Sequence, residues 1–157
     1  MTLITVLDRE LPDKLKSMLA YQRRAPLHIR LVSQHIYDFS LDGTSIFEIL
    51  RKLRTRKDAS IALLLDRKRY QEASLAIKEE IQKLEGIGVR FHTVRDLHAK
   101  IVTVENNQEK CALVTSANLS HHAYYESHEI GLYCQDICEV FKSIKKYITH
   151  LIMGQNP

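Results

Sequence analysis

Residues 97–104 read LHAKIVTV, in which a histidine and a lysine stand two positions apart before an apolar, β-branched run. In a β-strand, residues two positions apart leave the same face of the sheet, so His98 and Lys100 are expected to lie side by side. Burying two such side chains is costly unless an anionic group meets them. A phosphate suits the pair, because lysine supplies charge and imidazole acts as nucleophile or acid–base near neutral pH. This stretch therefore predicts phosphate chemistry at the edge of a sheet.

Two polar elements downstream strengthen this prediction. TSANLS at residues 115–120 places Ser116 and Asn118 after the next strand, where their hydroxyl and amide groups are expected to return to the same edge and hold phosphate oxygens. SHEIGL at residues 127–132 places Glu129 at the head of a further strand. A carboxylate that accepts one imidazole N–H fixes the tautomer of the ring. Each element alone also fits a solvated strand end or a turn with a helix cap; the three together are more specific.

The rest of the chain alternates helix-like and strand-like segments. Helices are predicted over residues 11–23, after a cap at Thr44 or Ser45, over 68–85 with a cap at Asp66, and over 137–152, with one or two helical turns in 118–125. Strands are predicted over residues 27–32, 60–65, 89–94, 99–104, 111–115 and 129–133, with a hairpin loop at Asn106 and Asn107. This order predicts one α/β domain over residues 1–157, with a mixed β-sheet sandwiched between helices.

Composition excludes several classes of protein. With 157 residues, 45% hydrophobic and 27% charged, the chain fits an ordinary globular domain rather than a disordered or coiled-coil one. No apolar run reaches the ~18 residues that a membrane span needs. Three cysteines, Cys111, Cys134 and Cys138, follow no pairing scheme, and the N-terminus does not resemble a signal peptide. We therefore expect a cytoplasmic protein with no membrane partner.

The cationic residues gather in runs, although the net charge is only +4. One run comprises Arg51, Lys52, Arg54, Arg56 and Lys57. It fits either a solvated helix face or a contact with nucleic-acid phosphates outside the reactive centre. Two further pairs also have two interpretations: His121 and His122 as exposed loop residues or substrate contacts, and Tyr124 and Tyr125 as packing residues or a platform for a base.

The string HAKIVTV…TSANLS…SHEIGL resembles the phospholipase D superfamily, and within it the small single-motif members similar to the bacterial endonuclease Nuc. The resemblance implies a phospholipase D-like fold. It also implies that His98 is the nucleophile that forms a phosphohistidine and that Lys100 binds the phosphate. Ser116 and Asn118 match the polar pair around the phosphoryl oxygens, and Glu129 matches the acid that orients the histidine. The chain departs from the family pattern at Glu105, where an aspartate is usual, and at Thr115, where a glycine is usual.

The resemblance also implies a dimer. Superfamily enzymes use two copies of the motif, but this chain has one; the nearest second copy, His28-Ile29-Arg30, lacks the lysine and the polar pair. We therefore expect a homodimer whose two subunits share one site. The resemblance implies no cofactor and no metal, because lysines and amide donors neutralise the phosphate charge. The sequence agrees, since no His-Cys-Asp cluster has metal-ligand spacing. The implied activity is that of a metal-independent phosphodiesterase, a non-specific endonuclease acting on DNA or RNA. A phospholipid phosphodiesterase or phosphatidyltransferase, and a non-catalytic nucleic-acid-binding subunit, are the alternatives.

Overall fold

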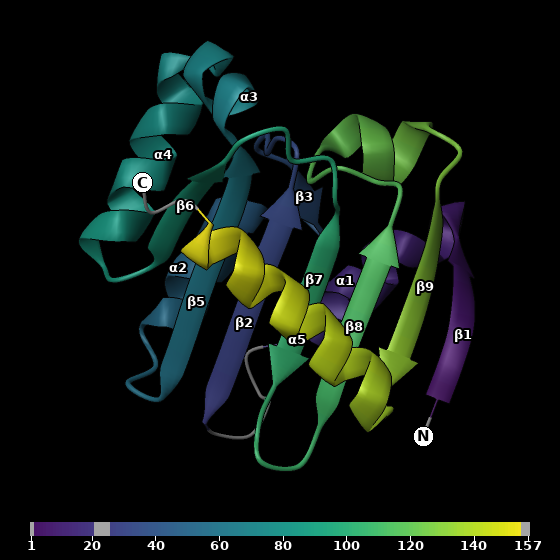
Figure 1. Ribbon diagram of the computed structural model, residues 1–157. Helices are drawn as coiled ribbons and strands as arrows, with labels where there is room; N and C mark the ends of the chain where they lie inside the picture. Colours follow the sequence, from purple (N-terminus) through teal and green to yellow (C-terminus); the bar gives the residue numbers. More distant parts are fainter. Residues whose placement is uncertain (1, 21–25, 155–157) are drawn as a thin grey trace.

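A seven-stranded mixed β-sheet forms the centre of the computed structural model, which describes residues 2–20 and 26–154 (Figure 1). The strand order is β1-β9-β8-β7-β2-β5-β6; β2, β5 and β6 are parallel, and every other neighbouring pair is antiparallel. The strands are β1 (Thr2–Leu7), β2 (Leu27–Ser33), β5 (Ala59–Asp66), β6 (Arg90–Val94), β7 (Ile101–Glu105), β8 (Lys110–Thr115) and β9 (Ile130–Gln135). β3 (Ser40–Leu41) and β4 (Thr44–Ser45) form a separate small hairpin.

Helices cover both faces of this sheet. α5 (Cys138–Met153) crosses one face diagonally (Figure 1), where Ile148 packs into a cluster with residues of β2, β5 and β7, and Phe141 packs on β8 and β9. The other face carries the larger core, which α1 (Leu11–Met18), α2 (Ile46–Arg54) and α4 (Leu75–Gly86) enclose. The mixed sheet between helices that the sequence predicts is confirmed.

Local sequence signals set several boundaries. The Ser45 hydroxyl accepts the Phe47 N–H at 3.2 Å and begins α2, and the Asp66 carboxylate accepts the Arg69 N–H at 2.9 Å and begins α3 (Arg67–Glu72). The single helix predicted over residues 68–85 is wrong, because Ser74 caps a new helix, α4, by accepting the Ile77 N–H at 3.3 Å. At the far end of α4, Gly88 adopts φ +95°, a conformation that side chains with a Cβ rarely tolerate.

Other boundaries differ from the prediction. β1, which the sequence analysis did not identify, pairs along its whole length with β9. The strand predicted from residue 99 begins at Ile101, so His98 and Lys100 lie in the extended loop before β7. The helix predicted over residues 11–23 ends at Met18, and residues 21–23 lie outside the described residues. The β7–β8 hairpin is confirmed, with Asn106 Oδ1 accepting two backbone N–H groups at 2.8 Å.

The pairing directions bring several loops to one edge of the sheet. β2 and β5 end there, β7 and β9 begin there, and β8 ends there, because β7 is antiparallel to both β2 and β8 (Figure 1, upper edge). We call this edge the His98 edge. It also carries η2 (His122–Glu126), a short π-helical turn where the sequence predicted helical turns. Within residues 2–20 and 26–154, no helix is long and apolar enough to cross a membrane.

Glu105, at the opposite end of β7, ties the sheet to α5. Its carboxylate accepts hydrogen bonds from Lys145 Nζ at 3.1 and 3.0 Å and from Arg30 Nη1 at 3.3 Å. Burial raises the pKa of Glu105, but the hydrogen bonds and charges of Lys145 and Arg30 outweigh it and hold the pKa below its usual value. Glu105, at the position where the family pattern has an aspartate, thus links β7 to β2 and α5 through Arg30 and Lys145.

We expect Glu105→Gln to lower the free energy of unfolding at pH 7 by about 1–3 kcal/mol, because Arg30 and Lys145 lose their shared counter-charge. A carboxyl group whose pKa is lower in the folded protein stabilises the fold fully at a pH above its pKa in the unfolded chain, about 4.3. This stabilisation is lost as the pH falls through the pKa in the folded protein. The difference from wild type should therefore shrink below about pH 4 in thermal or urea unfolding. Glu139→Gln, at a glutamate whose side chain is 89% exposed on α5, is the control; equal losses from both variants would contradict this role.

Candidate active site

His98 and Lys100 lie together in the loop before β7, as their spacing predicts. Lys100 Nζ is 3.3 Å from His98 Nδ1 and 3.4 Å from His98 Nε2, and it donates a hydrogen bond to the backbone oxygen of His98 at 2.7 Å. The imidazole is exposed, whereas Lys100 is only 7% exposed. The exposed imidazole of His98 therefore lies next to the ammonium group of the buried Lys100.

The buried ammonium of Lys100 lacks a full counter-charge. Burial lowers the pKa of Lys100, and the negative charge of Glu129 raises it only in part. A cation that is removed from water costs free energy unless an anion compensates it at close range. The loop thus favours binding of an anion beside His98.

Asn118 faces the same edge from the loop after β8. Its Oδ1 accepts the backbone N–H of Gln34 at 3.1 Å and lies 3.2 Å from Ser33 Oγ. Because a backbone N–H only donates, this contact identifies the oxygen of the amide and leaves Nδ2 with two donors. Nδ2 of Asn118 makes no hydrogen bond within the described residues. The amide therefore offers donors to a phosphate oxygen.

Ser33 is a positioning residue that the sequence analysis missed. It is fully buried at the end of β2, and its hydroxyl accepts the Leu119 N–H at 3.1 Å while lying beside Asn118 Oδ1. Ser33 thereby ties the end of β2 to the loop that carries Asn118. A serine that closes β2 directly after Leu31 and Val32 was the available signal, but its partner lies 85 residues away in the sequence.

Ser116 and Glu129 form a pair on the β8–β9 side of the edge. The Ser116 hydroxyl donates to Glu129 Oε2 and accepts the Ile130 N–H at 3.1 Å. Asp8 Oδ1 in turn accepts the Glu129 N–H at 2.6 Å. Within the described part of the chain, the carboxylate is hydrogen-bonded to Ser116 and not to His98, so the role of Glu129 in orienting the imidazole stays a prediction.

The basic run of residues 51–57 lies elsewhere. It occupies the end of α2 and the turn before β5, at the opposite end of the sheet from the His98 edge (Figure 1). Arg51 forms an ion pair with Glu80, and Arg56 Nε lies 3.1 Å from Asp58 Oδ1. A contact between this run and nucleic acid stays a prediction, and it would be remote from His98.

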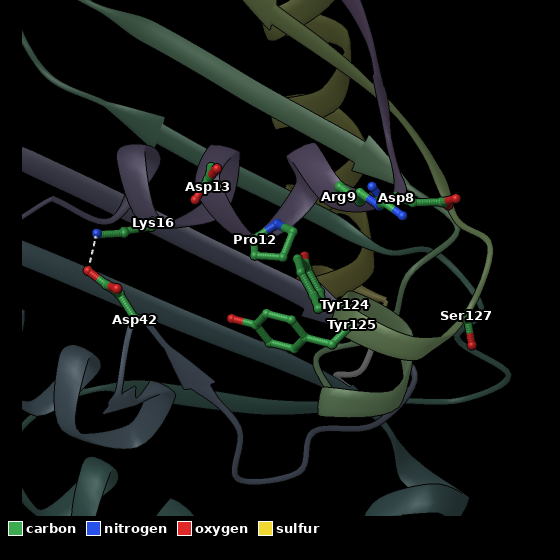
Figure 2. Close-up of a pocket in the computed structure, with 9 residues that line it drawn as sticks. All are labelled: Asp8, Arg9, Pro12, Asp13, Lys16, Asp42, Tyr124, Tyr125 and Ser127. Atoms are coloured by element: carbon green, nitrogen blue, oxygen red, sulfur yellow. Dashed lines mark hydrogen bonds and ion pairs between the residues drawn. The ribbon is translucent and has the colours of Figure 1, made fainter.

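Figure 2 shows a hollow between α1 and η2, with a volume of about 360 Å³. Tyr124 and Tyr125 line it, but His98, Lys100, Ser116, Asn118 and Glu129 do not. The residues that line it include three aspartates, Asp8, Asp13 and Asp42, and two cationic residues, Arg9 and Lys16. One of these, Lys16, is already paired with Asp42. The lining thus carries more negative than positive charge and disfavours a phosphate.

The tyrosine and histidine pairs at η2 differ in their burial and contacts. Tyr124 is only 3% exposed and stacks on Phe39, with ring centroids 5.3 Å apart, which agrees with the packing interpretation. Burial raises the pKa of Tyr124. His121 and His122 are exposed, and both contact Glu126, at 3.4 and 3.0 Å. Neither observation assigns these residues to a substrate.

Comparison with known proteins identifies the family. A family model described as "Cardiolipin synthase, PLD-like domain" matches residues 24–152, most of the chain. The chain belongs to this phospholipase D-like family. The motif from His98 to Glu129 lies inside the matched residues, and the resemblance that the sequence predicts is confirmed. No curated protein matches the sequence.

Solved structures share the phospholipase D-like fold. Nuc from Salmonella typhimurium, described as a phospholipase D family member, superposes with a TM-score of 0.69 at 14% identity, over 96% of this chain and 93% of its own. NucT from Helicobacter pylori superposes with a TM-score of 0.66 at 14% identity, over 97% of this chain and 96% of its own. Phosphatidylserine synthase from Haemophilus influenzae superposes with a TM-score of 0.70 at 16% identity, over 96% of this chain but only 36% of its own. At these identities the likeness shows the fold alone.

We expect Lys100→Met to leave the free energy of unfolding at pH 7 equal to or above that of wild type. Because the pKa of Lys100 is lower in the folded protein than in the unfolded chain, the charged lysine destabilises the fold at every pH below its folded-state pKa. This cost disappears above about pH 10.5, where the lysine is neutral in both states. Removing that cost offsets the lost hydrogen bond to His98, worth about 1 kcal/mol. Cleavage of a phosphodiester should fall by roughly 10²–10³-fold. Lys142→Met, at an exposed lysine of α5, is the control; marked destabilisation by Lys100→Met alone would assign Lys100 to the fold instead.

Proposed function

We propose that this phospholipase D-like protein is a metal-independent phosphodiesterase, a non-specific endonuclease that acts in the cytoplasm as a homodimer. One observation carries the proposal: an exposed imidazole stands beside the buried, under-compensated ammonium of Lys100. The free amide donors of Asn118 at the same edge add to it. The match of nearly the whole chain to nearly the whole of Nuc and NucT supports a nuclease.

The proposed reaction has two steps at phosphorus. An imidazole nitrogen of one His98 attacks the phosphorus, and the P–O bond to the leaving group breaks as His98 of the second subunit donates a proton to that oxygen. Lys100 and the Asn118 amide stabilise the negative charge on the non-bridging oxygens. The second histidine, now neutral, takes a proton from a water whose oxygen attacks the phosphohistidine and releases the first histidine. Contacts of this kind recognise phosphate and do not read bases.

Cleavage of labelled single- and double-stranded DNA and RNA in excess EDTA tests the activity. Wild type should cleave at least one of them, His98→Ala should lose cleavage, and denatured wild-type protein should carry an acid-labile label. His28→Ala, at the opposite end of the sheet, is the control because it removes a histidine of β2 without touching the His98 edge.

Other results lead to the alternatives. Binding without cleavage would assign the chain to non-catalytic nucleic-acid binding. If the protein neither binds nor cleaves nucleic acid but hydrolyses phosphatidyl substrates, the lipid alternative replaces the nuclease. Cleavage that EDTA abolishes would contradict the histidine mechanism.

An apolar surface beside Ser116 supports the proposed homodimer. On β8 and β9 the register pairs Val114 with Leu132, and Ser116 exchanges hydrogen bonds with Ile130. Their neighbours on β1 continue the surface, so that the exposed apolar residues are Leu3, Leu7, Val114, Ile130 and Leu132. A contiguous exposed patch of this kind is typical of an interaction surface. A second copy placed here would bring a second His98 edge next to the first.

We expect Leu132→Asp to yield a monomer that does not cleave, because a carboxylate at the centre of this surface must be desolvated in the dimer. Light scattering should then give a mass near 18.2 kDa instead of twice that value. Leu75→Asp, at a leucine 72% exposed on α4, is the control and should stay dimeric and active. A wild-type protein that is monomeric and active would contradict the shared site.

A further inference from the structure

A second hollow, of about 170 Å³, opens beside the His98 edge where the loop after β2 faces α3. Its floor is apolar and comes from β5 and α4. We call it the His35 hollow. The walls that carry rings or charge are His35, Tyr37, Arg69, Tyr70 and Glu72.

The loop that carries the hollow is tied to the candidate active site. Gln34 N–H donates to Asn118 Oδ1 at 3.1 Å, and three residues later Tyr37 N–H donates to Leu119 O at 2.9 Å. On the other side, Asp66, which caps α3, accepts the Leu97 N–H at 2.9 Å, one residue before His98. The hollow is therefore fixed in place relative to both Asn118 and His98.

The electrostatic field of the site extends into the hollow. Burial lowers the pKa of His35, and the positive charges of Arg69 and Lys100 lower it further. Arg69 Nη1 lies 3.9 Å from Glu72 in an ion pair between two exposed side chains, and such pairs contribute little free energy. The guanidinium can therefore exchange this partner for a phosphate.

The aromatic rings differ in their availability. Tyr70 makes an edge contact with Phe91, with centroids 4.8 Å apart, so it serves as a wall. Tyr37 is 53% exposed and tilts by 57° against His35 at 5.0 Å. An exposed ring that shares a hollow with the guanidinium of Arg69 is an arrangement that can stack a base while its backbone phosphate is held.

We propose that the His35 hollow holds the nucleotide next to the scissile phosphate, with its base on Tyr37 and its outer phosphate on Arg69. This inference rests on the proposed function and narrows its substrate. A base reaches Tyr37 only when it leaves the duplex stack, which costs free energy in double-stranded substrates. The favoured substrate is therefore a single strand of nucleic acid.

The test compares two phosphodiesters. One is a labelled single-stranded oligonucleotide, and the other is bis(p-nitrophenyl) phosphate, which offers a scissile phosphate without neighbouring nucleotides. Tyr37→Ala should lower the ratio of their kcat/KM values roughly tenfold, the effect of one lost base stack. Tyr37→Phe, which keeps the ring, and Tyr147→Ala, at a tyrosine 43% exposed on α5, should preserve the ratio. Arg69→Gln should lower the ratio and reduce the salt dependence of oligonucleotide binding.

A binding measurement separates this inference from the proposed activity. Fluorescence anisotropy of the same oligonucleotide is measured with His98→Ala and with the His98→Ala, Tyr37→Ala double variant, so that cleavage plays no part. The double variant should bind roughly tenfold more weakly. Equal affinities, no binding, or an equal loss on both substrates overturns the hollow as a subsite. If wild type cleaves neither substrate but binding still depends on Tyr37, the endonuclease proposal fails and the hollow stands.

Discussion

The antiparallel hydrogen bonding of β7 between β2 and β8 is the constraint on which the site depends. β2, β5 and β6 run parallel, and the chain reverses at β7. That reversal brings the loop before β7 to the edge where β2 and β5 end, and the hairpin to β8 then returns the chain to the same edge. Residues as distant in sequence as Ser33 and Asn118 meet there for this reason. A one-residue slip of β7 would turn every side chain of the strand to the other face.

The same edge combines an under-compensated charge with available amide donors. Lys100 is buried without a close carboxylate, and Asn118 keeps two donors unused among the described residues. Glu105, at the other end of β7, is also largely buried but is matched by Arg30 and Lys145. The contrast is informative: a compensated charge at one end of a strand stabilises the fold, whereas an under-compensated charge at the other end favours a ligand. Perturbed ionisable groups cluster at functional sites for this physical reason.

Local patterns predicted much of this arrangement. The apolar run at residues 60–65 predicted β5, and the spacing of His98 and Lys100 predicted that their side chains lie together. β1 was not predicted because its half-exposed residues acquire a partner only through β9, more than a hundred residues later. Ser74 ends one helix and caps the next, which an apolar stripe alone does not indicate. Ser33 and Tyr37 could not be assigned, because their significance comes from contacts with Asn118 and Leu119 that exist only in the fold.

The placement of charge also explains why composition was a weak guide to function. The net charge of +4 includes the basic run of residues 51–57, yet Arg51 and Arg56 there are paired with neighbouring carboxylates at the end remote from His98. The positive charges that act on His35, beside the His98 edge, come instead from Arg69 and Lys100. In the proposed dimer the two-fold axis relates two His98 side chains and two His35 hollows, whereas a phosphodiester strand has a direction. The strand itself must therefore decide which histidine attacks and which protonates, so that two identical subunits supply both a nucleophile and an acid without any difference in sequence.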